Sequence, residues 1–438
     1  MGMTVQRLIT DVRAVLTTVA PFLLLAIAMV TLAYLLLDPN PPRHVTLATG
    51  VPQGAYAEFG QRYAERLARY GISVELRNTQ GTAENLALLN DAGSGVDIAF
   101  VQGGASDGAD KQALQSLGSM FYEPVWLFYR VDSAKKKLRR PRLDNLAQLQ
   151  GWTLNIGAPG SGVPQLATQL LEANRIDAGT IFLSQQPVTP AVVELLEGRL
   201  DAVVLASAPE SAMVQMLLQT PGIALFDFAQ AEAYTRRFGF LSSVTLPRGV
   251  VDLARDLPAA DVRMVAPTAT LVARPGLHPA LTQLFVQAAR DVHGGSGWFQ
   301  RKGDFPNARS SERELANEAE RFYRNGVPWL QRYLPFWLSN LIDRMWLALL
   351  SIVAVLLPLS RVVPPLVELR IRSRVFRWYA KLRQIEDGVG ERPAGELLAA
   401  LDDIESKASG VQVPLSYADE LYALKGHIQM VRRRVQAA

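Results

Sequence analysis

The sequence predicts an α/β protein of two lobes with a central cleft, flanked by two transmembrane helices and followed by a C-terminal helical hairpin. Three observations lead to this prediction. Residues 15–37 and 345–363 are apolar membrane-span candidates, although the second is short and contains Pro358. Between them, strand-like and helix-like stretches alternate in two series. An aromatic, β-rich stretch over residues 120–131 separates the two series and predicts an extended crossover.

The composition argues against several kinds of site. The 438 residues carry 45 Lys and Arg against 41 Asp and Glu, so the net charge of +4 gives no reason to expect a nucleic-acid partner. The absence of cysteine excludes disulfides, thiol nucleophiles and cysteine metal sites. We expect no metal, because the scattered histidines form no ligand pair (His44, His278, His293 and His427). No nucleophile elbow, phosphate-loop lysine or zinc-protease motif occurs, so we expect no catalytic residues and no cofactor.

The first series predicts lobe 1. Helical spacing gives residues 54–70 one apolar face, which carries Tyr56, Phe59, Tyr63 and Leu67. The next helix begins after Gly81, with Thr82 as its expected N-cap. Strands are predicted at residues 44–50, 72–79 and 96–102. We expect a parallel sheet with helices on both faces, whose ligands lie beyond the carboxyl ends of the strands.

The second series predicts lobe 2. Residues 132–142 are basic and polar, and we expect them to form an exposed loop. Residues 262–273 are expected to return to lobe 1 as a strand, covered by a helix over residues 279–292. The predicted strands cover residues 152–156, 181–184, 202–206 and 223–228, and the helices cover 163–174, 190–197 and 209–218.

A glycine-rich turn over residues 157–162 joins a strand of lobe 2 to the helix at 163–174. A helix start carries unpaired backbone N–H groups and the positive end of the helix dipole, which suits an anion. Gly160 and Gly162 allow the backbone to approach a ligand, and Ser161 can cap the helix or donate a hydrogen bond. An ordinary capped turn is the alternative.

Several segments together resemble the TAXI family, the TRAP-associated extracytoplasmic immunogenic solute receptors. The similarity covers most of residues 44–325 in the right order. The resemblance implies a type II periplasmic-binding-protein-like fold, whose two lobes close on an acidic or amino-acid-like solute such as glutamate. It rests on Ala48-Thr49-Gly50 with Gly54-Ala55-Tyr56 and Gly60, on residues 78–85, on residues 97–102 and on residues 157–162.

The sequence departs from the family pattern at two places. Val163-Pro164 follows the turn where family members often have Thr-Arg or a similar polar pair. Ala55-Tyr56 stands where Tyr-Tyr is usual. These departures leave the identity of the ligand open. The segment over residues 326–344 resembles the membrane-attached subgroup, for which a transport role is inferred from the fold.

The resemblance and the helix starts together give a hypothesis for the ligand site. Glu123 and Trp126, on the crossover, are expected to line the hinge side. The alternative is a structural role for each residue. Thr82 and Ser161 then only cap helices, Tyr56 and Trp126 belong to the core, and Gln102 is a strand-end side chain whose hydrogen bonds are all made within the protein. The predicted ligand-binding residues are Tyr56, Thr79, Gly81, Thr82, Asn85, Gln102, Gly160, Ser161, Gly162, Thr189 and Ser207.

Positive charge flanking the two apolar segments predicts their orientation. Arg7 and Arg13 precede the first, and a run of arginines and lysines follows the second. The positive-inside rule then places both termini in the cytoplasm and the main domain in the periplasm, at the inner membrane. The first segment is expected to be an uncleaved anchor, with a cleaved signal sequence as the alternative.

The domain divisions follow from this orientation. They are a cytoplasmic N-terminus at 1–14, transmembrane helices at 15–37 and 345–363, a linker at 38–43, a solute-binding domain at 44–325, a membrane-proximal segment at 326–344, and a cytoplasmic end at 364–438. Lobe 1 is expected at 44–128 and 245–300, and lobe 2 at 132–240. The cytoplasmic end combines a basic helix that touches membrane lipid with a helical hairpin over 396–407 and 414–435.

The predicted function is a membrane-tethered periplasmic solute receptor of TRAP/TAXI type. Its expected partners are a small carboxylate or amino-acid solute, a TRAP-type permease and membrane lipid. The alternative is a transmembrane sensor or scaffold protein that keeps the binding fold without transport.

Overall fold

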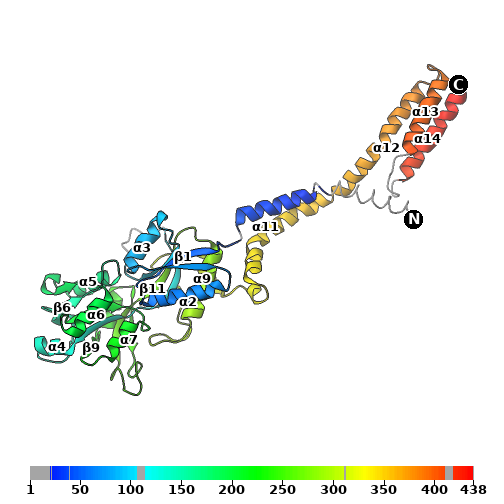
Figure 1. Ribbon diagram of the computed structural model, residues 1–438. Coiled ribbons are helices and arrows are strands. Elements are labelled where there is room, and N and C mark those ends of the chain that lie inside the picture. Colours follow the sequence, from blue (N-terminus) through cyan, green and yellow to red (C-terminus); the bar gives the residue numbers. More distant parts are fainter. Residues whose placement is uncertain are drawn as a thin grey trace. The chain divides into compact units, whose positions relative to one another are not determined.

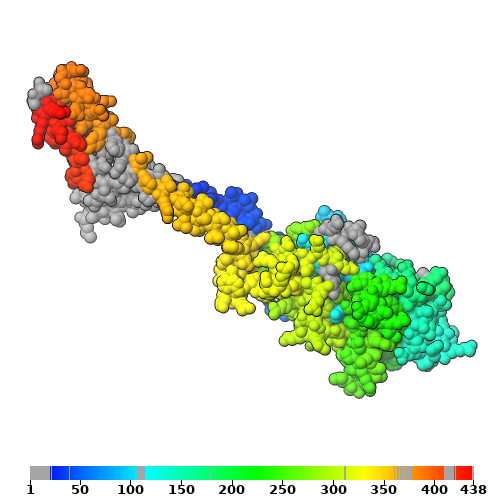
Figure 2. All heavy atoms as spheres, turned by 180° about the vertical axis from the view of Figure 1, so that it is seen from behind, coloured from blue at the N-terminus to red at the C-terminus, as the bar shows by residue number. Residues whose placement is uncertain are grey.

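The computed structural model describes residues 20, 22–38, 40–105, 114–309, 312–409 and 418–437 (Figure 1). The chain divides into two compact units. The α/β unit is Asn40–Ser339, and the helical unit combines Met1–Pro39 with Asn340–Ala438. Within the α/β unit, the cyan to green part of the chain gathers at one end (Figure 2).

The α/β unit contains two mixed sheets, and we name lobe 1 and lobe 2 after the first and the second. In the first sheet, of order β10-β11-β3-β1-β2 with β4 also paired to β11, β1 is parallel to β2 and β3. Strand β11 runs antiparallel to β3, β4 and β10, so the expectation of a purely parallel sheet is wrong. The strands are β1 His44–Ala48, β2 Ser73–Arg77, β3 Ile98–Gln102, β4 Gln115–Tyr122, β10 Leu241–Leu246 and β11 Val262–Ala273.

The second sheet has the order β7-β6-β8-β5-β9. Strand β6 is parallel to β7 and β8, whereas β5 runs antiparallel to β8 and β9. The mixture arises because β5 enters from the crossover rather than through a strand–helix–strand connection. The strands are β5 Val125–Arg130, β6 Thr153–Asn155, β7 Phe182–Ser184, β8 Ala202–Ala206 and β9 Ile223–Leu225.

Alternating side chains of β3 show how the sequence builds two apolar layers in lobe 1. Ile98 and Phe100 pack with α2 and α9, whereas Ala99 and Val101 pack with α3. The apolar face expected over residues 54–70 is confirmed, because Tyr56, Phe59, Tyr63 and Leu67 are all buried on α2. The helices of this lobe are α2 Ala55–Ala68, α3 Thr82–Asn90, α9 Pro279–His293 and α10 Asn317–Asn325.

The helices of lobe 2 include one that the sequence analysis missed. Residues 132–142 were expected to form a loop, but α4 covers Val131–Leu138. Asp132 in its first turn and Lys135 to Lys137 in its last turn complement the helix dipole, and Ala134 and Leu138 pack into the lobe 2 core from one side of the helix. The short α8 and strand β10 were not predicted either. The helices are α4, α5 Val163–Ala173, α6 Val188–Glu197, α7 Ala212–Gln219 and α8 Ala231–Arg237.

The crossover between the sheets is two strands rather than one. Strand β4 ends at Tyr122 in the first sheet and β5 begins at Val125 in the second. The break falls at Glu123-Pro124, where proline lacks the N–H group that a continuous strand would use. Glu123 therefore stands at the point where the chain passes from lobe 1 to lobe 2.

One helix in the described residues is long and apolar enough to cross a membrane, Phe336–Leu359, most of which belongs to the helical unit. It belongs to α11, Phe336–Ser360, which begins well before the expected start at residue 345. The first predicted span is described only as a shorter apolar helix, Phe22–Leu37, and most of residues 15–21 lie outside the described part. Two transmembrane helices therefore stay a prediction.

Three helices form the C-terminal end of the helical unit. The expected pair of helices packs together, and α12 joins it as a third, so the hairpin prediction is incomplete. Leu382 and Ile385 near the end of α12 extend its apolar face into the shared core, and Leu401 and Ile428 lie at the centre of that core. Residues 414–417 of the expected hairpin lie outside the described residues. The helices are α12 Val363–Asp387, α13 Ala394–Ser409 and α14 Ala418–Ala437.

Candidate functional site

The two helix starts proposed as ligand anchors contact each other directly. The Gly160 carbonyl oxygen in lobe 2 accepts hydrogen bonds from the backbone N–H groups of Ala83 and Glu84 in lobe 1, at 3.1 and 3.2 Å. A Cβ atom on Gly81 would lie 3.3 Å from the Ser161 Cα atom. The lobes thus meet backbone to backbone, at positions where glycine permits the approach.

The contact occupies the anion-binding end of α3. Ala83 and Glu84 lie in the first turn of α3, whose N–H groups have no partner within the helix. The partially negative oxygen of Gly160 satisfies two of these donors at the positive end of the helix dipole. A ligand carboxylate would compete for the same donors.

Thr82 does not cap α3 as expected. The N-cap is Gly81, with a φ of 129° and no side-chain capping bond. The Thr82 hydroxyl instead accepts a hydrogen bond from the backbone N–H of Gln102 at 3.0 Å. Thr82 therefore links the start of α3 to the carboxyl end of β3.

Thr79 and Asn85 brace the loop that leads into α3. The Thr79 hydroxyl donates to Asn85 Oδ1 at 2.7 Å, and Asn85 Nδ2 donates to the carbonyl oxygens of Thr49 and Phe100 at 2.6 and 2.8 Å. Both side chains are buried and their polar atoms are occupied. Their contribution is to hold the α3 start in place.

Ser161 makes its hydrogen bond within its own turn. Its hydroxyl donates to the Ala158 carbonyl oxygen at 2.7 Å, so it does not cap α5, whose N-cap is Gly162. Pro164 at the start of α5 removes one of the N–H groups that an anion would use. The start of α5 is consequently a poorer anion site than the start of α3.

A buried polar cluster lies behind this contact in lobe 1. The Tyr56 hydroxyl donates to Glu123 Oε2 at 2.8 Å, and the Tyr56 ring stacks on Phe100 at 4.9 Å. Burial raises the pKa of Glu123 to about 8, although the hydrogen bond from Tyr56 lowers it. Burial, and then the charge of Glu123, raises the pKa of Tyr56 well above its ordinary value. Glu123 is therefore largely protonated at neutral pH.

Gln102 connects this cluster to lobe 2. A Cβ atom added to Gly162 of lobe 2 would lie only 2.0 Å from the side-chain oxygen of Gln102. Its Nε2 atom is buried and has no hydrogen-bond partner in the described part of the chain. An unpaired buried donor is costly, so Gln102 presents a group that a ligand can satisfy.

Thr189 and Ser207 do not join the cluster. Thr189 is exposed at the start of α6, and Ser207 is half-buried after β8. The described residues show no side-chain hydrogen bond from either to the other predicted site residues; the Ser207 carbonyl oxygen accepts from Trp126 Nε1 at 2.8 Å. Trp126 is fully buried and stacked with Phe128, which matches the sheet-packing alternative.

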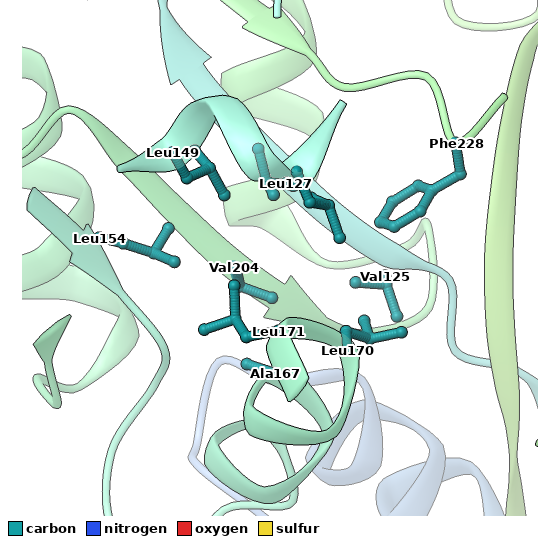
Figure 3. A pocket seen from close by; sticks show the side chains of 10 residues that line it. Val125, Leu127, Leu149, Leu154, Ala167, Leu170, Leu171, Val204 and Phe228 are labelled. Carbon is teal, nitrogen blue, oxygen red and sulfur yellow. The ribbon is translucent and has the colours of Figure 1, made fainter. Parts of the chain in front are cut away.

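Lobe 2 contains an apolar cavity of about 20 Å³ between its sheet and α5 (Figure 3). Side chains such as Leu127, Leu154, Leu170 and Phe228 surround it, and its lining includes no charged or hydroxyl-bearing side chain. Its volume admits about one water molecule, which would find no polar partner there. The cavity is a packing defect rather than a solute site.

Sequence reasoning placed Glu123 only at the hinge and overlooked its chemistry. The signal was visible as a Glu-Pro pair inside an otherwise apolar stretch. The contact of Gly160 with the α3 start had no comparable signal, because it involves backbone atoms alone. The described residues contain no group of His, Asp or Glu side chains that could hold a metal ion.

The sequence model of the NMT1-like family matches residues 47–291, more than half of the chain. The chain belongs to the NMT1-like family. This family is periplasmic-binding-protein-like, so the coarse fold prediction is confirmed, with two mixed sheets in place of parallel ones. The matched range of the NMT1-like chain includes every predicted site residue. A search of the curated proteins finds no match.

Solved structures similar to this NMT1-like chain include a protein from Bordetella bronchiseptica RB50, at 17% identity, 57% coverage of this chain, 71% of that chain, and a TM-score of 0.40. The alkanesulfonate-binding protein SsuA from Xanthomonas axonopodis pv. citri, bound to MOPS, has 13% identity, coverages of 58% and 73%, and a TM-score of 0.37. The BenM effector-binding domain with benzoate has 12% identity, coverages of 60% and 96%, and a TM-score of 0.39.

Proposed function

We propose that the chain is a membrane-tethered solute receptor of TAXI type, whose two lobes close on a small carboxylate or amino-acid solute. The observation that carries the proposal is the hydrogen bonding of the Gly160 carbonyl oxygen to Ala83 and Glu84 across the lobes. A group of lobe 2 occupies an anion-binding helix start of lobe 1, behind which lies a buried polar cluster. This is the arrangement expected of a ligand site closed on itself.

Binding then exchanges one partner of α3 for another. A solute carboxylate replaces the Gly160 oxygen on the N–H groups of Ala83 and Glu84, and lobe 2 closes over the solute. The solute stabilises the closed form only by its preference for that form over the open one. A solute that contacts both lobes has such a preference.

The proposal includes a location and partners. The apolar helix Phe336–Leu359 anchors the receptor in the inner membrane, with the α/β unit in the periplasm and both termini in the cytoplasm.

 This anchor is long and apolar enough to span a bilayer, and Arg361 follows it as the positive-inside rule requires. A TRAP-type permease is the partner that would read the closed form, and membrane lipid surrounds the anchor.

A thermal-shift screen of the full chain in detergent tests the proposal. The panel is the amino acids and the dicarboxylic acids. A solute at about 100 times its Kd should stabilise the folded chain by about 2.7 kcal/mol, which raises the melting temperature by several degrees. If no member of the panel shifts the melting temperature, the proposal is contradicted.

Cysteine labelling tests the location. The chain has no cysteine, so single cysteines can be introduced without background. Leu253 is exposed in the α/β unit and Tyr422 in the helical unit, which makes Leu253→Cys and Tyr422→Cys a matched pair. A membrane-impermeant maleimide should label Leu253→Cys in cells with a permeabilised outer membrane, and Tyr422→Cys only after lysis. The reverse pattern would overturn the proposed orientation.

A sensor is the second candidate, and the C-terminal bundle of α12, α13 and α14 favours it. This bundle has its own apolar core, centred on Leu401 and Ile428. A chain without residues 364–438 separates the two candidates. A receptor that only delivers solute should still support uptake of the solute in cells, whereas a sensor should lose the cellular response while solute binding persists.

A further inference from the structure

Helix α14 has an exposed stripe of side chains that the C-terminal bundle does not cover (Figure 1). Leu424 and Ile428, on the opposite face of the helix, are fully buried in the bundle core. On the outer face, Tyr422 is 71% exposed and Met430 is 60% exposed, so apolar surface is left open. We call the exposed set at helical spacing the α14 stripe, and its members are Asp419, Tyr422, Gly426, Met430 and Arg433.

The order of residues in the α14 stripe is symmetric about Gly426. Tyr422 and Met430 lie four residues to either side of Gly426, and Asp419 and Arg433 lie seven residues to either side. These separations are close to one and two turns of an α-helix, so the five positions share one face. The stripe therefore has a negative end, a positive end, and an aromatic ring matched with a thioether side chain between them.

The charged ends of the α14 stripe have no partner within the bundle. Arg432 and Arg434, on either side of Arg433, form ion pairs with residues of α13 and α12. Neither Arg433 nor Asp419 has an ion pair or a side-chain hydrogen bond with any residue that the structure describes. Both charges are therefore available to a partner that presents the opposite charges at the same separation.

Gly426 lies at the centre of the α14 stripe with open space beside it. A Cβ atom added there would have no heavy atom of the described residues within 4 Å. Glycine in a helix interior destabilises the helix relative to alanine, and no contact of the bundle requires it at this position. What glycine does provide is room for another backbone to approach closely.

We propose that the α14 stripe is a two-fold interface with a second copy of this chain. A two-fold axis through Gly426 makes the two α14 helices antiparallel, so Gly426 meets its own copy where the helices cross. Tyr422 then packs against Met430 of the second copy, and Asp419 pairs with Arg433 of the second copy. The axis repeats both contacts, because a two-fold interface joins the same surface on each subunit.

The dimer goes beyond the proposed function, because its formation needs no solute. A single pair of helices buries little surface, so the interface alone is weak and reversible. Anchoring of both copies in one membrane raises their effective concentration and favours the dimer. Two copies in one membrane are related by an axis along the membrane normal, so α14 lies parallel to the membrane surface in the dimer.

Disulfide trapping of the full chain in detergent tests the geometry. The chain has no cysteine, so Gly426→Cys carries a single thiol. Gly395→Cys is the control, because Gly395 is exposed on α13 with equally open surroundings. Mild oxidation should link Gly426→Cys into a covalent dimer roughly 10-fold or more faster than the control. A mixture of Tyr422→Cys and Met430→Cys should form the mixed dimer in preference to either self-linked dimer.

Charge exchange tests the pairing of the two ends by sedimentation of the full chain in detergent over a range of concentrations. Asp419→Arg opposes arginine with arginine, and Arg433→Asp opposes aspartate with aspartate, so each should weaken the dimer roughly 10-fold. The double variant restores opposite charges and should recover the dimer. A variant that merely disturbs the folding of α14 would not be rescued in this way.

Charge on the axis gives a second test that does not depend on loss of folding. Gly426→Glu opposes two glutamates where the helices cross, so it should abolish the dimer. The same change replaces glycine by a good helix former, so the melting temperature should not fall. Gly395→Glu, the matched control on α13, should leave the dimer intact.

The outcomes decide between the possible partners of α14. Equal trapping of Gly426→Cys and Gly395→Cys, or a double charge variant that stays as weak as the single variants, would overturn the two-fold interface. A full chain that stays monomeric and cannot be trapped would also overturn it, and would leave the α14 stripe to a different protein. Solute binding by the α/β unit would be unaffected in each case.

Discussion

The two lobes bury different chemistry. Lobe 1 encloses Tyr56, Gln102, Glu123 and the imidazole of His293, whereas the core of lobe 2 contains an apolar cavity that holds none of these groups (Figure 3). A cavity of about 20 Å³ lies in lobe 2, whereas buried polar atoms without a hydrogen-bond partner in the described residues occur in both lobes, at Gln102 Nε2 in lobe 1 and at Trp152 Nε1 and Gln169 Oε1 in lobe 2. What distinguishes lobe 1 is the buried carboxyl group of Glu123, because the buried polar residues described in lobe 2, Asn155 and Ser211, carry no charge.

The largest predicted effect is on the pH dependence of stability. The folded state holds the Glu123 proton, because burial raises the pKa from 4.5 to about 8. Stability is then fully present below 4.5 and is lost as the pH rises toward 8, by up to about 1.4 kcal/mol per pH unit. Chemical denaturation across this range should show the decline in the unliganded wild type and a flatter profile in Glu123→Gln. Identical profiles of stability against pH in the two proteins would mean that the folded state does not hold a proton on Glu123.

His293 should act with the opposite sign. Burial first, and the charge of Arg62 second, lower its pKa from 6.5 to about 3. The neutral imidazole packs between Phe59 and Phe121 at ring distances of 4.5 and 5.2 Å. Stability should therefore fall as the pH drops below 6.5 toward 3, and His293→Phe should weaken this acid loss in the same denaturation series. An unchanged loss of stability at acid pH in the variant would show that His293 does not cause this loss.

The contact between the lobes predicts tighter solute binding in Gly160→Ala. The added Cβ atom would lie 3.1 Å from Gln80 of lobe 1, at a φ of +91°. Gly151→Ala is the control, because its φ is +72° and no atom lies within 4 Å of the new Cβ. Both changes carry a backbone cost of about 1 kcal/mol, but only Gly160→Ala disturbs the contact that competes with the solute for the α3 start, so only this variant should bind the solute more tightly, by roughly 10-fold. Equal solute affinities in the two variants would show that the contact of Gly160 with lobe 1 plays no part in solute binding.

The smallest effect is expected in lobe 2. Val204 lines the cavity, and Val204→Ile adds one methylene group to it. The chain should gain about 0.5 to 1 kcal/mol of stability without a change in solute affinity. Val193→Ile adds the same group on the exposed side of α6 and should leave the stability unchanged. A change of affinity in Val204→Ile would show that the lobe 2 core takes part in recognition.

Helices and strands were predicted best where their buried side chains recur at a regular spacing in the sequence. Helix α2 and strand β11 follow their expected residues because each has a continuous apolar face. Strand direction was not predictable, because alternation is the same in parallel and antiparallel strands. Helix α4 was missed because its apolar side, with Ala134 and Leu138, is short and lies among many charged residues. The boundaries proposed for the two lobes stay a prediction.

The contact between the lobes was predicted in outline, whereas the ligand site itself stays a prediction. Residue types placed Gly81, Gln102 and Gly160 near the cleft, and these residues do lie at the contact between the lobes. Thr82 was expected as a cap because sequence does not distinguish the N-cap from the first helical residue. The roles of Glu123 and of the Gly160 carbonyl depend on long-range burial and on backbone contacts, which no local pattern records.

Spin-label distances between the lobes test the central claim most directly. Ala87 on α3 and Glu172 on α5 are exposed on opposite lobes, and the cysteine-free chain allows Ala87→Cys with Glu172→Cys to be labelled alone. The solute with the largest thermal shift should change the mean distance and narrow its distribution, because the solute takes the place of the Gly160 oxygen between the two lobes and fixes one closed arrangement. A distribution that stays the same with and without that solute would contradict a receptor that works by closure.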